Sequence, residues 1–451
     1  MQPRNVFWIM TDEQRADSIG APAGAFAPMP NLDRLAAESV RFRTAVTPSP
    51  MCVPARTSVL SGLMPAQTGV WRNRANPVTS PAPPMLVDWF REAGYETVSY
   101  GKQHYLLNGR AFDHEEQLVL SDHVGYERYR GGRSHSDYGG VQFRGPTHWI
   151  MGGAFPAPEE ETAEWTVADR AIETLRRRDR SRPLFMRLSF NAPHTPVVPP
   201  QQYIDLSPQR IPEPPSMLAT DPGWPGWLRL LQGRYANAGL FDGGELPTMR
   251  RHYAAWCSFV DAMIGRFLDA LREEGLYDES VVVFCSDHGA HLGDHGLVQK
   301  QSFFTESVTV PYLVHAAGVE PRDADEPVSI LSLLPTAGGL AGLACPPDWA
   351  AVDFSGDLAT GRGPSPGPVF SQGMLNPAML EFDHRLVMVQ EGSLRATFDL
   401  DDPAEPPLAF DLERDPHELD SVGGESAHSA DLKRLRALAE ASVSTAQERT
   451  Y

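Results

Sequence analysis

Cysteine is scarce in this chain of 451 residues. The four cysteines, Cys52, Cys257, Cys285 and Cys345, lie far apart, and no two of them form a C-x-x-C pair. This pattern excludes a disulfide framework and the close cysteine pairs of zinc sites. A signal peptide is not indicated either, because the apolar run at 5–10 is too short for one. These absences predict a reduced, cytoplasmic setting.

Long apolar runs and excess positive charge are also absent. No segment is long and apolar enough to span a bilayer, although 41% of the residues are hydrophobic, which leaves room for two or three globular domains. Acidic residues outnumber Lys and Arg by 58 to 39, and the formal net charge is −19. Because this field repels nucleic acid and anionic membranes, we expect neither as a partner. An anionic small-molecule substrate would need a local cationic pocket.

Lysine is the rarest cation. Only three lysines, Lys102, Lys300 and Lys433, occur among the 39 cationic residues, so arginine fills nearly every other basic position. Because arginine is used so widely here, a position that keeps lysine suggests a site that needs the compact charge of an ammonium group rather than a planar guanidinium. Lys102 and Lys300 both lie in motifs that carry chemistry.

A short helix is predicted to begin at Cys52. Pro54 suits the first turn of a helix and Gly62 suits its end. The unpaired N–H groups and the positive dipole end at such a helix start favour an anion. By itself, Cys52 is open to two interpretations, an inert buried thiol or a thiolate nucleophile. The second is disfavoured because only three residues separate Cys52 from Arg56, whereas a thiolate phosphatase uses a longer loop.

Short apolar runs alternate with helical patterns, which predicts an α/β fold with a large, mostly parallel sheet between helices. Four of the predicted strands end in potential ligands. Since the carboxyl ends of parallel strands meet at one edge of a sheet, we expect these side chains to converge on one site. They are Asp12 after 5–10, Lys102 and His104 after 95–100, His194 after 183–190, and Asp287 and His288 after 280–285.

The motifs resemble those of a known family. Cys52-x-Pro54-x-Arg56 is similar to the sulfatase signature, in which the cysteine is oxidised to formylglycine after translation. The segment 286–311 resembles the metal-and-lysine segment of sulfatases in the alkaline phosphatase superfamily, and the motifs at 101–104 and 193–194 match in the expected order. The resemblance implies an alkaline-phosphatase-like α/β catalytic domain over 1–343. It also implies a smaller α+β subdomain over 344–451, with a small antiparallel sheet and a helix.

The resemblance further implies a divalent metal held by Asp12, Asp287, His288 and an oxygen of the modified Cys52. Carboxylate-rich ligation favours Ca²⁺, and the single imidazole leaves Mn²⁺ open. Many sulfatases carry a second aspartate after the first, and this chain has Glu13 there. Whether the longer side chain of Glu13 reaches the metal is left open.

Nucleophilic attack on sulfur is the first implied step. A hydroxyl of the formylglycine hydrate attacks sulfur while the metal and Arg56 hold the hydrate. Lys102 and Lys300 hold the sulfate oxygens, and His194 gives a proton to the leaving oxygen.

Release of the sulfate is the second implied step. His104 is the expected base that deprotonates the second hydroxyl of the hydrate, and Asn73 is expected to face the substrate. A formylglycine-generating enzyme would act on Cys52 during maturation.

Two alternatives remain open. Phosphonate monoester hydrolases also resemble this chain, and a phosphonate monoester or phosphodiester carries one negative charge, as a sulfate monoester does. The Gly-Lys-x-His motif at 101–104 favours the sulfatase. The other alternative is a metal-binding homologue that has lost catalysis, with Cys52 unmodified.

The alcohol of the substrate and the oligomeric state, a homo-oligomer included, are not determined by the sequence. Trp149, Trp224, Trp227 and His148 would suit a pocket for an aromatic or cationic group, as choline-type recognition requires, but loop packing is the favoured interpretation. The Pro- and Trp-rich stretch 199–244 is expected to lie outside the core.

Overall fold

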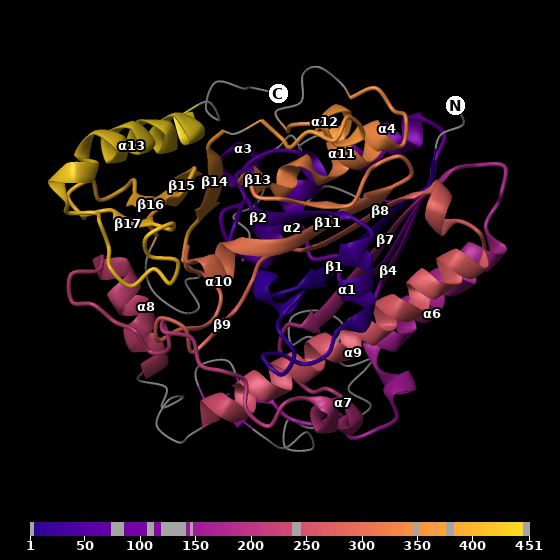
Figure 1. Ribbon diagram of the computed structural model, residues 1–451, viewed down its shortest axis with the longest axis horizontal. Helices are drawn as coiled ribbons and strands as arrows, with labels where there is room; N and C mark the ends of the chain where they lie inside the picture. The colour runs from indigo at the N-terminus through magenta and orange to yellow at the C-terminus, as the bar shows by residue number, and fades with distance from the viewer. Residues whose placement is uncertain are drawn as a thin grey trace.

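A nine-stranded sheet forms the centre of the computed structural model, and helices cover both of its faces (Figure 1). The strand order is β12-β2-β11-β8-β1-β7-β3-β4, with β13 paired to β2. All of the adjacent pairs are parallel except those of β11, which runs antiparallel to β8 and β2. The structure describes residues 4–73, 85–105, 112–118, 141–144, 148–236, 245–345, 351–365, 367–375 and 383–444.

The four central strands carry the site. They are β8 (Val281–Ser286), β1 (Val6–Asp12), β7 (Leu184–Pro193) and β3 (Glu96–Gly101). All residues of β1, β7 and β8 are buried, as expected for parallel strands covered on both faces. The outer strands are β2 (Val40–Val46), β4 (His114–Gln117), β11 (Thr309–Ala316), β12 (Arg322–Ala324) and β13 (Val328–Ser329).

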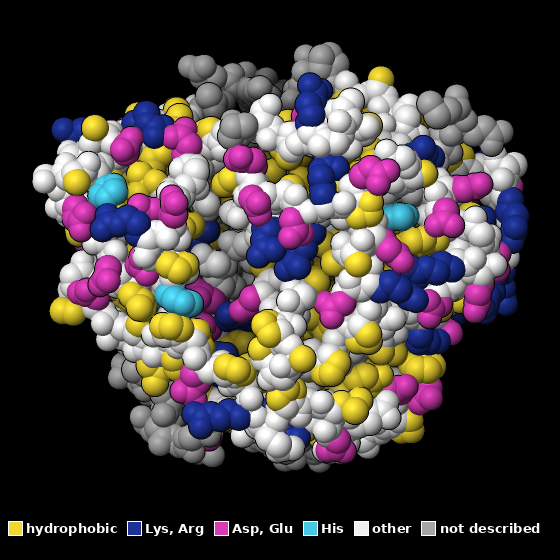
Figure 2. Space-filling model, viewed as in Figure 1, with side chains coloured by type: hydrophobic (Ala, Val, Ile, Leu, Met, Phe, Trp, Pro, Cys, Tyr) yellow, Lys and Arg dark blue, Asp and Glu magenta, His cyan; other side chains and the backbone are white. Residues whose placement is uncertain are grey.

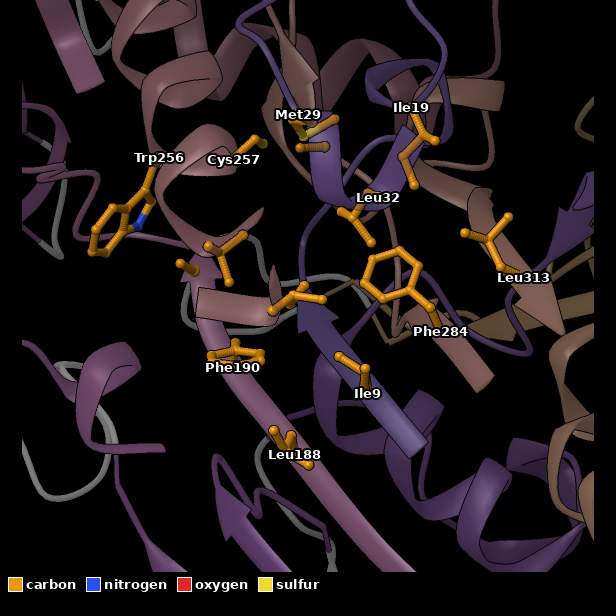
Figure 3. Packing of buried hydrophobic residues seen from close by; sticks show 14 of the residues in the cluster. Ile9, Ile19, Met29, Leu32, Leu188, Phe190, Trp256, Cys257, Phe284 and Leu313 are labelled. Carbon is orange, nitrogen blue, oxygen red and sulfur yellow. The ribbon is translucent and has the colours of Figure 1, made fainter. Parts of the chain in front are cut away.

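Each face of the sheet has its own hydrophobic core. On one face, Ile9, Leu188 and Phe284 belong to a buried cluster that also contains Leu32 and Trp256 (Figure 3). The helices of this face are α1 (Pro30–Ala37), α6 (Ala163–Arg177), α7 (Gln201–Leu206) and α9 (Glu245–Glu273). The other face is covered by α2 (Cys52–Ser61), α4 (Leu86–Glu92), α11 (Leu333–Leu340) and α12 (Ser355–Ala359).

A second, four-stranded antiparallel sheet lies toward the C-terminus. Its order is β14 (Val369–Gly373), β15 (Leu386–Glu391), β16 (Leu394–Asp399), β17 (Leu408–Asp411), and α13 (Ser429–Ser444) packs on it. The expected fold class is therefore confirmed. The boundary between 343 and 344 remains a prediction.

Smaller elements connect these layers. They are α3 (Pro65–Thr68), β5 (Val141–Arg144), β6 (His148–Gly152), α8 (Gly226–Ala236), β9 (His291–Leu292), β10 (Val298–Gln299) and α10 (Thr305–Val308). Among the described helices, none has both the length and the apolar character that a bilayer span requires. On the face drawn in Figure 2, basic and acidic side chains are interspersed.

Candidate active site

The ends of the four central strands meet, as the sequence predicts. Asp12 pairs with Pro193 across β1 and β7, and Gly101 pairs with Ser189 across β3 and β7. The backbone N–H of His194 donates to the carbonyl of Asp12 over 3.1 Å. Predicted ligands that are far apart in sequence therefore lie at one edge of the sheet.

Cys52 is the first residue of α2 and has no exposed surface. The helix ends at Gly62, whose φ of 70° is the left-handed conformation that favours glycine. In the first turn, the N–H of Val53 donates to Oδ1 of Asn73 over 3.0 Å. The predicted helix is confirmed, and the half-buried Asn73 turns out to cap its first turn.

The thiol of Cys52 lies among cations. Its Sγ is 3.1 Å from Nζ of Lys300, 3.1 Å from Nε2 of His288 and 3.6 Å from Oδ1 of Asp12. Burial raises the pKa of this thiol, but the charges of Lys300, Lys102 and His288 outweigh burial and hold the pKa well below its ordinary value. The site therefore stabilises an anion at this side chain. In a formylglycine, an oxygen on Cβ would stand where Sγ stands here.

Arg56 lies one helical turn after Cys52 and is fully buried. Its Nε donates to Oδ2 of Asp287 over 2.7 Å and its Nη2 donates to Oδ2 of Asp12 over 2.8 Å. Its Nη1 donates to the carbonyl of Lys102 and to Oγ of Ser189. The guanidinium thus fixes two carboxylates, while its expected contact with the nucleophile remains a prediction.

Four predicted ligands form one group. The ligand atoms of Asp12, Cys52, Asp287 and His288 all lie within 4.8 Å of one another, and all four residues are buried. Nδ1 of His288 is 2.9 Å from the carbonyl of Gly289, which assigns the proton to Nδ1 and turns Nε2 toward the group.

The charges of this group fit a cation. For Asp287, burial and the charge of Asp12 raise the pKa above its ordinary value. For His288, burial lowers the pKa, but Asp287 outweighs burial and the pKa rises to about 9. Without a metal, the raised pKa therefore keeps His288 protonated, because its positive charge offsets the charge of the neighbouring carboxylates. The two carboxylates are donors that Ca²⁺ and Mn²⁺ prefer, and the imidazole is a donor that fits Mn²⁺ better than Ca²⁺.

The carboxylate of Glu13 lies next to this group of four ligands. The φ of this residue is 68°, which a residue other than glycine rarely adopts, and its N–H donates to Oδ1 of Asp287 over 3.1 Å. Its Oε2 lies 3.4 Å from Nζ of Lys300 and 3.6 Å from Nε2 of His194. In this geometry the carboxylate faces Lys300 and His194, within 4.8 Å of the ligand atom of Asp12.

The two predicted lysines face the same space. Nζ of Lys102 is 2.8 Å from Oδ2 of Asp12, and both lysines are buried. Burial lowers the pKa of Lys300, but the charges of Cys52 and Glu13 raise it above the ordinary value. Lys300 is flanked by Gln299 (φ 64°) and Gln301 (φ 82°), and such left-handed residues concentrate at functional sites.

The two predicted histidines have different environments. Nδ1 of His194 is 2.6 Å from the carbonyl of Thr195, so the proton is assigned to Nδ1 and Nε2 faces Glu13. Burial and the charges of Lys102 and Lys300 lower the pKa of His194. His104, which is half-buried with a φ of 43°, interacts with the Cys52 thiol, and burial lowers its pKa.

Sequence reasoning missed Ser189. Its Oγ accepts a hydrogen bond from Arg56 over 2.7 Å and donates to the carbonyl of Lys102 over 2.6 Å. A serine that interrupts the apolar run of β7 was the available signal.

The tryptophans pack in the core. Trp224 and Trp227 are each 2% exposed and belong to the main cluster, where the ring of Trp224 lies 5.6 Å from that of Phe304. Both therefore serve packing, as expected, although Trp227 lies on α8 and only Trp224 in a loop, and the expectation that 199–244 lies outside the core is wrong for this part. The side chains of His148 and Trp149 lie outside the described part of the structure.

The fold is the one that phosphonate monoester hydrolases and sulfatases share, and in it a group of possible metal ligands and two lysines surround the residue at the start of α2. A model of the sulfatase family matches residues 4–343, and the chain belongs to this family. Family membership confirms the expectation of a sulfuric ester hydrolase.

Two curated relatives cover much of the chain. It is 28% identical to a choline-sulfatase of Rhizobium meliloti, over 96% of this chain and 85% of that one. It is 27% identical to an arylsulfatase of Clostridium perfringens, over 77% of this chain and 76% of that one.

Solved structures share the fold. A phosphonate monoester hydrolase from Silicibacter pomeroyi superposes with a TM-score of 0.80 at 22% identity, covering 96% of this chain and 94% of the other. A protein in complex with its substrate D-glucosamine-2-N,6-O-disulfate superposes with a TM-score of 0.78 at 20% identity, covering 100% and 99%.

Proposed function

We propose that this protein hydrolyses a sulfate monoester by cleaving the S–O bond, using a formylglycine derived from Cys52. The observation that carries the proposal is the position of Sγ, which belongs to the metal-ligand group and lies 3.1 Å from Lys300 at the start of α2. Asp12, Asp287 and His288 would hold a divalent cation, Ca²⁺ by the carboxylate content and Mn²⁺ as the other candidate. The bound cation would supply charge stabilisation at the sulfate oxygens.

Conversion of Cys52 supplies chemistry that a thiol lacks. The hydrated aldehyde carries two hydroxyls, one to attack sulfur and one whose deprotonation expels the sulfate. A formylglycine-generating enzyme is the partner that this requires, and we place the protein in the cytoplasm.

The lysines and His194 would act on the first step. Lys102 and Lys300 converge on the same space and can neutralise sulfate oxygens as charge develops. His194 has Nδ1 held by a backbone carbonyl, which leaves Nε2 to give a proton to the leaving oxygen. A bound anion offsets the two lysines that lower the pKa of His194, so the substrate itself favours the protonated acid.

His104 would act on the second step. It interacts with the side chain of residue 52, and its lowered pKa keeps it neutral at physiological pH, as a base must be. Asn73 would contribute its amide nitrogen to the substrate.

A phosphonate monoester or phosphodiester hydrolase is the second candidate, supported by the shared fold and by the single negative charge of both substrate classes. In either case Glu13 favours a substrate with one negative charge, because its carboxylate lies beside Lys300 and would repel a second negative charge on the substrate. A metal-binding protein with unmodified Cys52 is the candidate of another class.

One set of measurements separates these candidates. Protein co-expressed with a formylglycine-generating enzyme is assayed on p-nitrophenyl sulfate, p-nitrophenyl phenylphosphonate and bis-p-nitrophenyl phosphate, with Cys52→Ala as the blank. The mass of the tryptic peptide 44–56 reports conversion of Cys52. We expect an aldehyde mass and the highest kcat/KM on the sulfate. An aldehyde mass with faster phosphonate hydrolysis would establish the second candidate, and an intact thiol in protein from the native source would establish the third.

The alcohol of the ester is a separate question. The two curated relatives suggest choline and aryl sulfates, and a screen that adds sugar sulfates tests all three classes.

A further inference from the structure

Arg187 is a buried cation that the proposed chemistry does not use. It lies on β7, has no exposed surface, and forms no ion pair with a carboxylate in the described part of the chain. Burial and the charge of Arg56 lower its pKa to about 10, so it remains charged at neutral pH. A fully buried, unpaired charge is costly compared with an apolar side chain of the same size. Its presence therefore calls for a reason beyond packing.

The described groups closest to the guanidinium are aromatic rings and neutral polar atoms, while Glu115 and Arg56 act on it only through their charges. The rings of Trp8 and Phe112 are each 5.2 Å from Cζ, and the ring of Tyr105 is 5.5 Å from it. Nε donates to Oγ of Ser99 over 3.0 Å. The cation–π contacts and this hydrogen bond hold the guanidinium in one orientation.

That orientation aims the guanidinium at the turn behind the active site. Nη2 donates to Oε1 of Gln103 and lies 3.4 Å from the carbonyl of Lys102. The same carbonyl accepts hydrogen bonds from Ser189 over 2.6 Å and from Arg56 over 3.0 Å. Arg187 and Ser189 lie two residues apart on β7 and therefore share a face of the sheet.

The turn over 101–104 needs such an anchor. Gly101 has a φ of 100°, and a Cβ there would lie 2.0 Å from the carbonyl oxygen of Ser189. His104 has a φ of 43°, which is uncommon for a residue other than glycine. Within the turn, Lys102 reaches Asp12 and His104 interacts with Cys52, while Gln103 reaches Arg187.

We propose that Arg187 is a positioning residue, which fixes the turn through Gln103 and the Lys102 carbonyl so that Lys102 and His104 face residue 52. This inference rests on the roles proposed for Lys102 and His104. The proposal gives Arg187 no contact of its own with substrate or metal, and none of the possible metal-ligand groups includes it.

The kinetic test uses full-length, formylglycine-containing, metal-loaded enzyme on p-nitrophenyl sulfate. We expect Arg187→Met to lower kcat about 10- to 100-fold, because small displacements of catalytic groups have large effects. Arg187→Lys keeps the positive charge but lacks the planar guanidinium, so its kcat should lie between those of Arg187→Met and the wild type. Gln103→Met should lower kcat in the same direction. The double variant should lose less than the product of the single losses, because both break one connection.

Two comparisons separate positioning from general stability. Arg395→Met removes another buried arginine, which pairs with Glu418 beside the C-terminal sheet, and should lower the melting temperature without the drop in kcat. If Arg187→Met lowers only the melting temperature and leaves kcat and KM as in the wild type, the proposal is wrong. If Arg187→Met does not fold, Gln103→Met decides, since Gln103 is half-buried.

A structural readout keeps this test apart from the proposed function. In a crystal structure of Gln103→Met or Arg187→Met, we expect the Lys102 carbonyl to move away from Nη1 of Arg56. Absence of any turnover by the wild type would defeat the proposed function, whereas an unmoved turn in the variants would defeat this inference.

Discussion

Nε of Arg56 donates to Oδ2 of Asp287 over 2.7 Å, and neither side chain has any exposed surface. This bond joins the helix that carries Cys52 to the end of β8. Burial lowers the pKa of Arg56, but Asp287 and Asp12 raise it above the ordinary value, so the guanidinium stays charged. The spacing of Cys52 and Arg56 in the motif thus has a structural reason, since one helical turn separates Cys52 from the guanidinium that orients Asp12 and Asp287.

Arg56→Met should therefore affect the metal as well as the fold. It leaves Asp12 and Asp287 buried without their common partner, which typically costs about 3–5 kcal/mol of unfolding free energy. It also releases the carboxylates from fixed positions, so we expect metal affinity to fall about 10- to 100-fold. Calorimetric titration with Ca²⁺ and Mn²⁺ and urea unfolding measure the two effects. Arg56→Lys keeps a charge but cannot bridge both carboxylates, so its metal affinity and unfolding free energy should lie between those of Arg56→Met and the wild type. Unchanged metal affinity in Arg56→Met would contradict the assignment of Asp12 and Asp287 as metal ligands.

Cys52→Ser tests how the sulfate leaves. A serine offers one hydroxyl for attack but no second hydroxyl to expel the group. With p-nitrophenyl sulfate we expect about one equivalent of p-nitrophenol per active site and then no further release, with a sulfated protein in the mass spectrum. Cys52→Ala should release none. Sustained turnover by the serine variant would show that formylglycine is not required.

Much of this site follows from local sequence signals. Apolar runs predicted β1, β7 and β8, and polar residues directly after them predicted where the ligands gather, because parallel strands present their carboxyl ends together. Pro54 and Gly62 predicted α2 because each marks one end of a helix by its own backbone chemistry.

Other features depend on contacts between distant segments. Trp224 lies in a Pro-rich stretch that looks like a surface loop, yet it is buried against Phe304 from another part of the chain. The direction of the Glu13 side chain follows from its left-handed backbone and from Lys300, neither of which a propensity encodes. The antiparallel direction of β11 likewise depends on strand order, which local patterns do not specify.

Metal binding should depend on pH through His288. In the metal-free protein its pKa is raised to about 9, so the proton must leave before Nε2 can bind a cation. Apparent metal affinity should therefore rise about tenfold per pH unit below pH 9 and level off above it, as for the loss of one proton. Titrations at several pH values, in buffers of different ionisation enthalpy, measure the affinity and the proton released. His288→Asn removes the titrating imidazole and should flatten this dependence.

The same shift has a consequence for stability. Because the folded-state pKa of His288 exceeds its unfolded value, its protonation contributes stability that is fully present below about pH 6.5. In metal-free protein this contribution should be lost as the pH rises through about 9. Saturating metal replaces the proton, so the loss should disappear when melting temperatures are measured with metal present.

Glu13→Gln tests whether the charge of Glu13 makes the site select a substrate with a single negative charge. Oε2 of Glu13 lies 3.4 Å from Nζ of Lys300 and 3.6 Å from Nε2 of His194, so its charge sits beside the groups assigned to the substrate. A dianionic aryl phosphate places a second charge there, and like charges at this distance repel even at an effective dielectric constant of about 20. The glutamine keeps the shape and removes the repulsion. We expect the ratio of kcat/KM for p-nitrophenyl phosphate to that for p-nitrophenyl sulfate to rise at least about tenfold, which is about 1.4 kcal/mol.

The control for this prediction is another monoanion measured on the same variant. The ratio for p-nitrophenyl phenylphosphonate to sulfate should stay within about twofold, because both substrates carry one charge and gain equally when Glu13 is neutralised. Glu13→Asp keeps the charge on a shorter side chain and should leave the phosphate ratio low. If the phosphonate ratio rises together with the phosphate ratio, Glu13 acts on the geometry of the phosphoryl group and its charge does not set the preference. If metal affinity falls in Glu13→Gln but not in Glu13→Asp, the carboxylate binds the cation and the substrate effect follows from the metal.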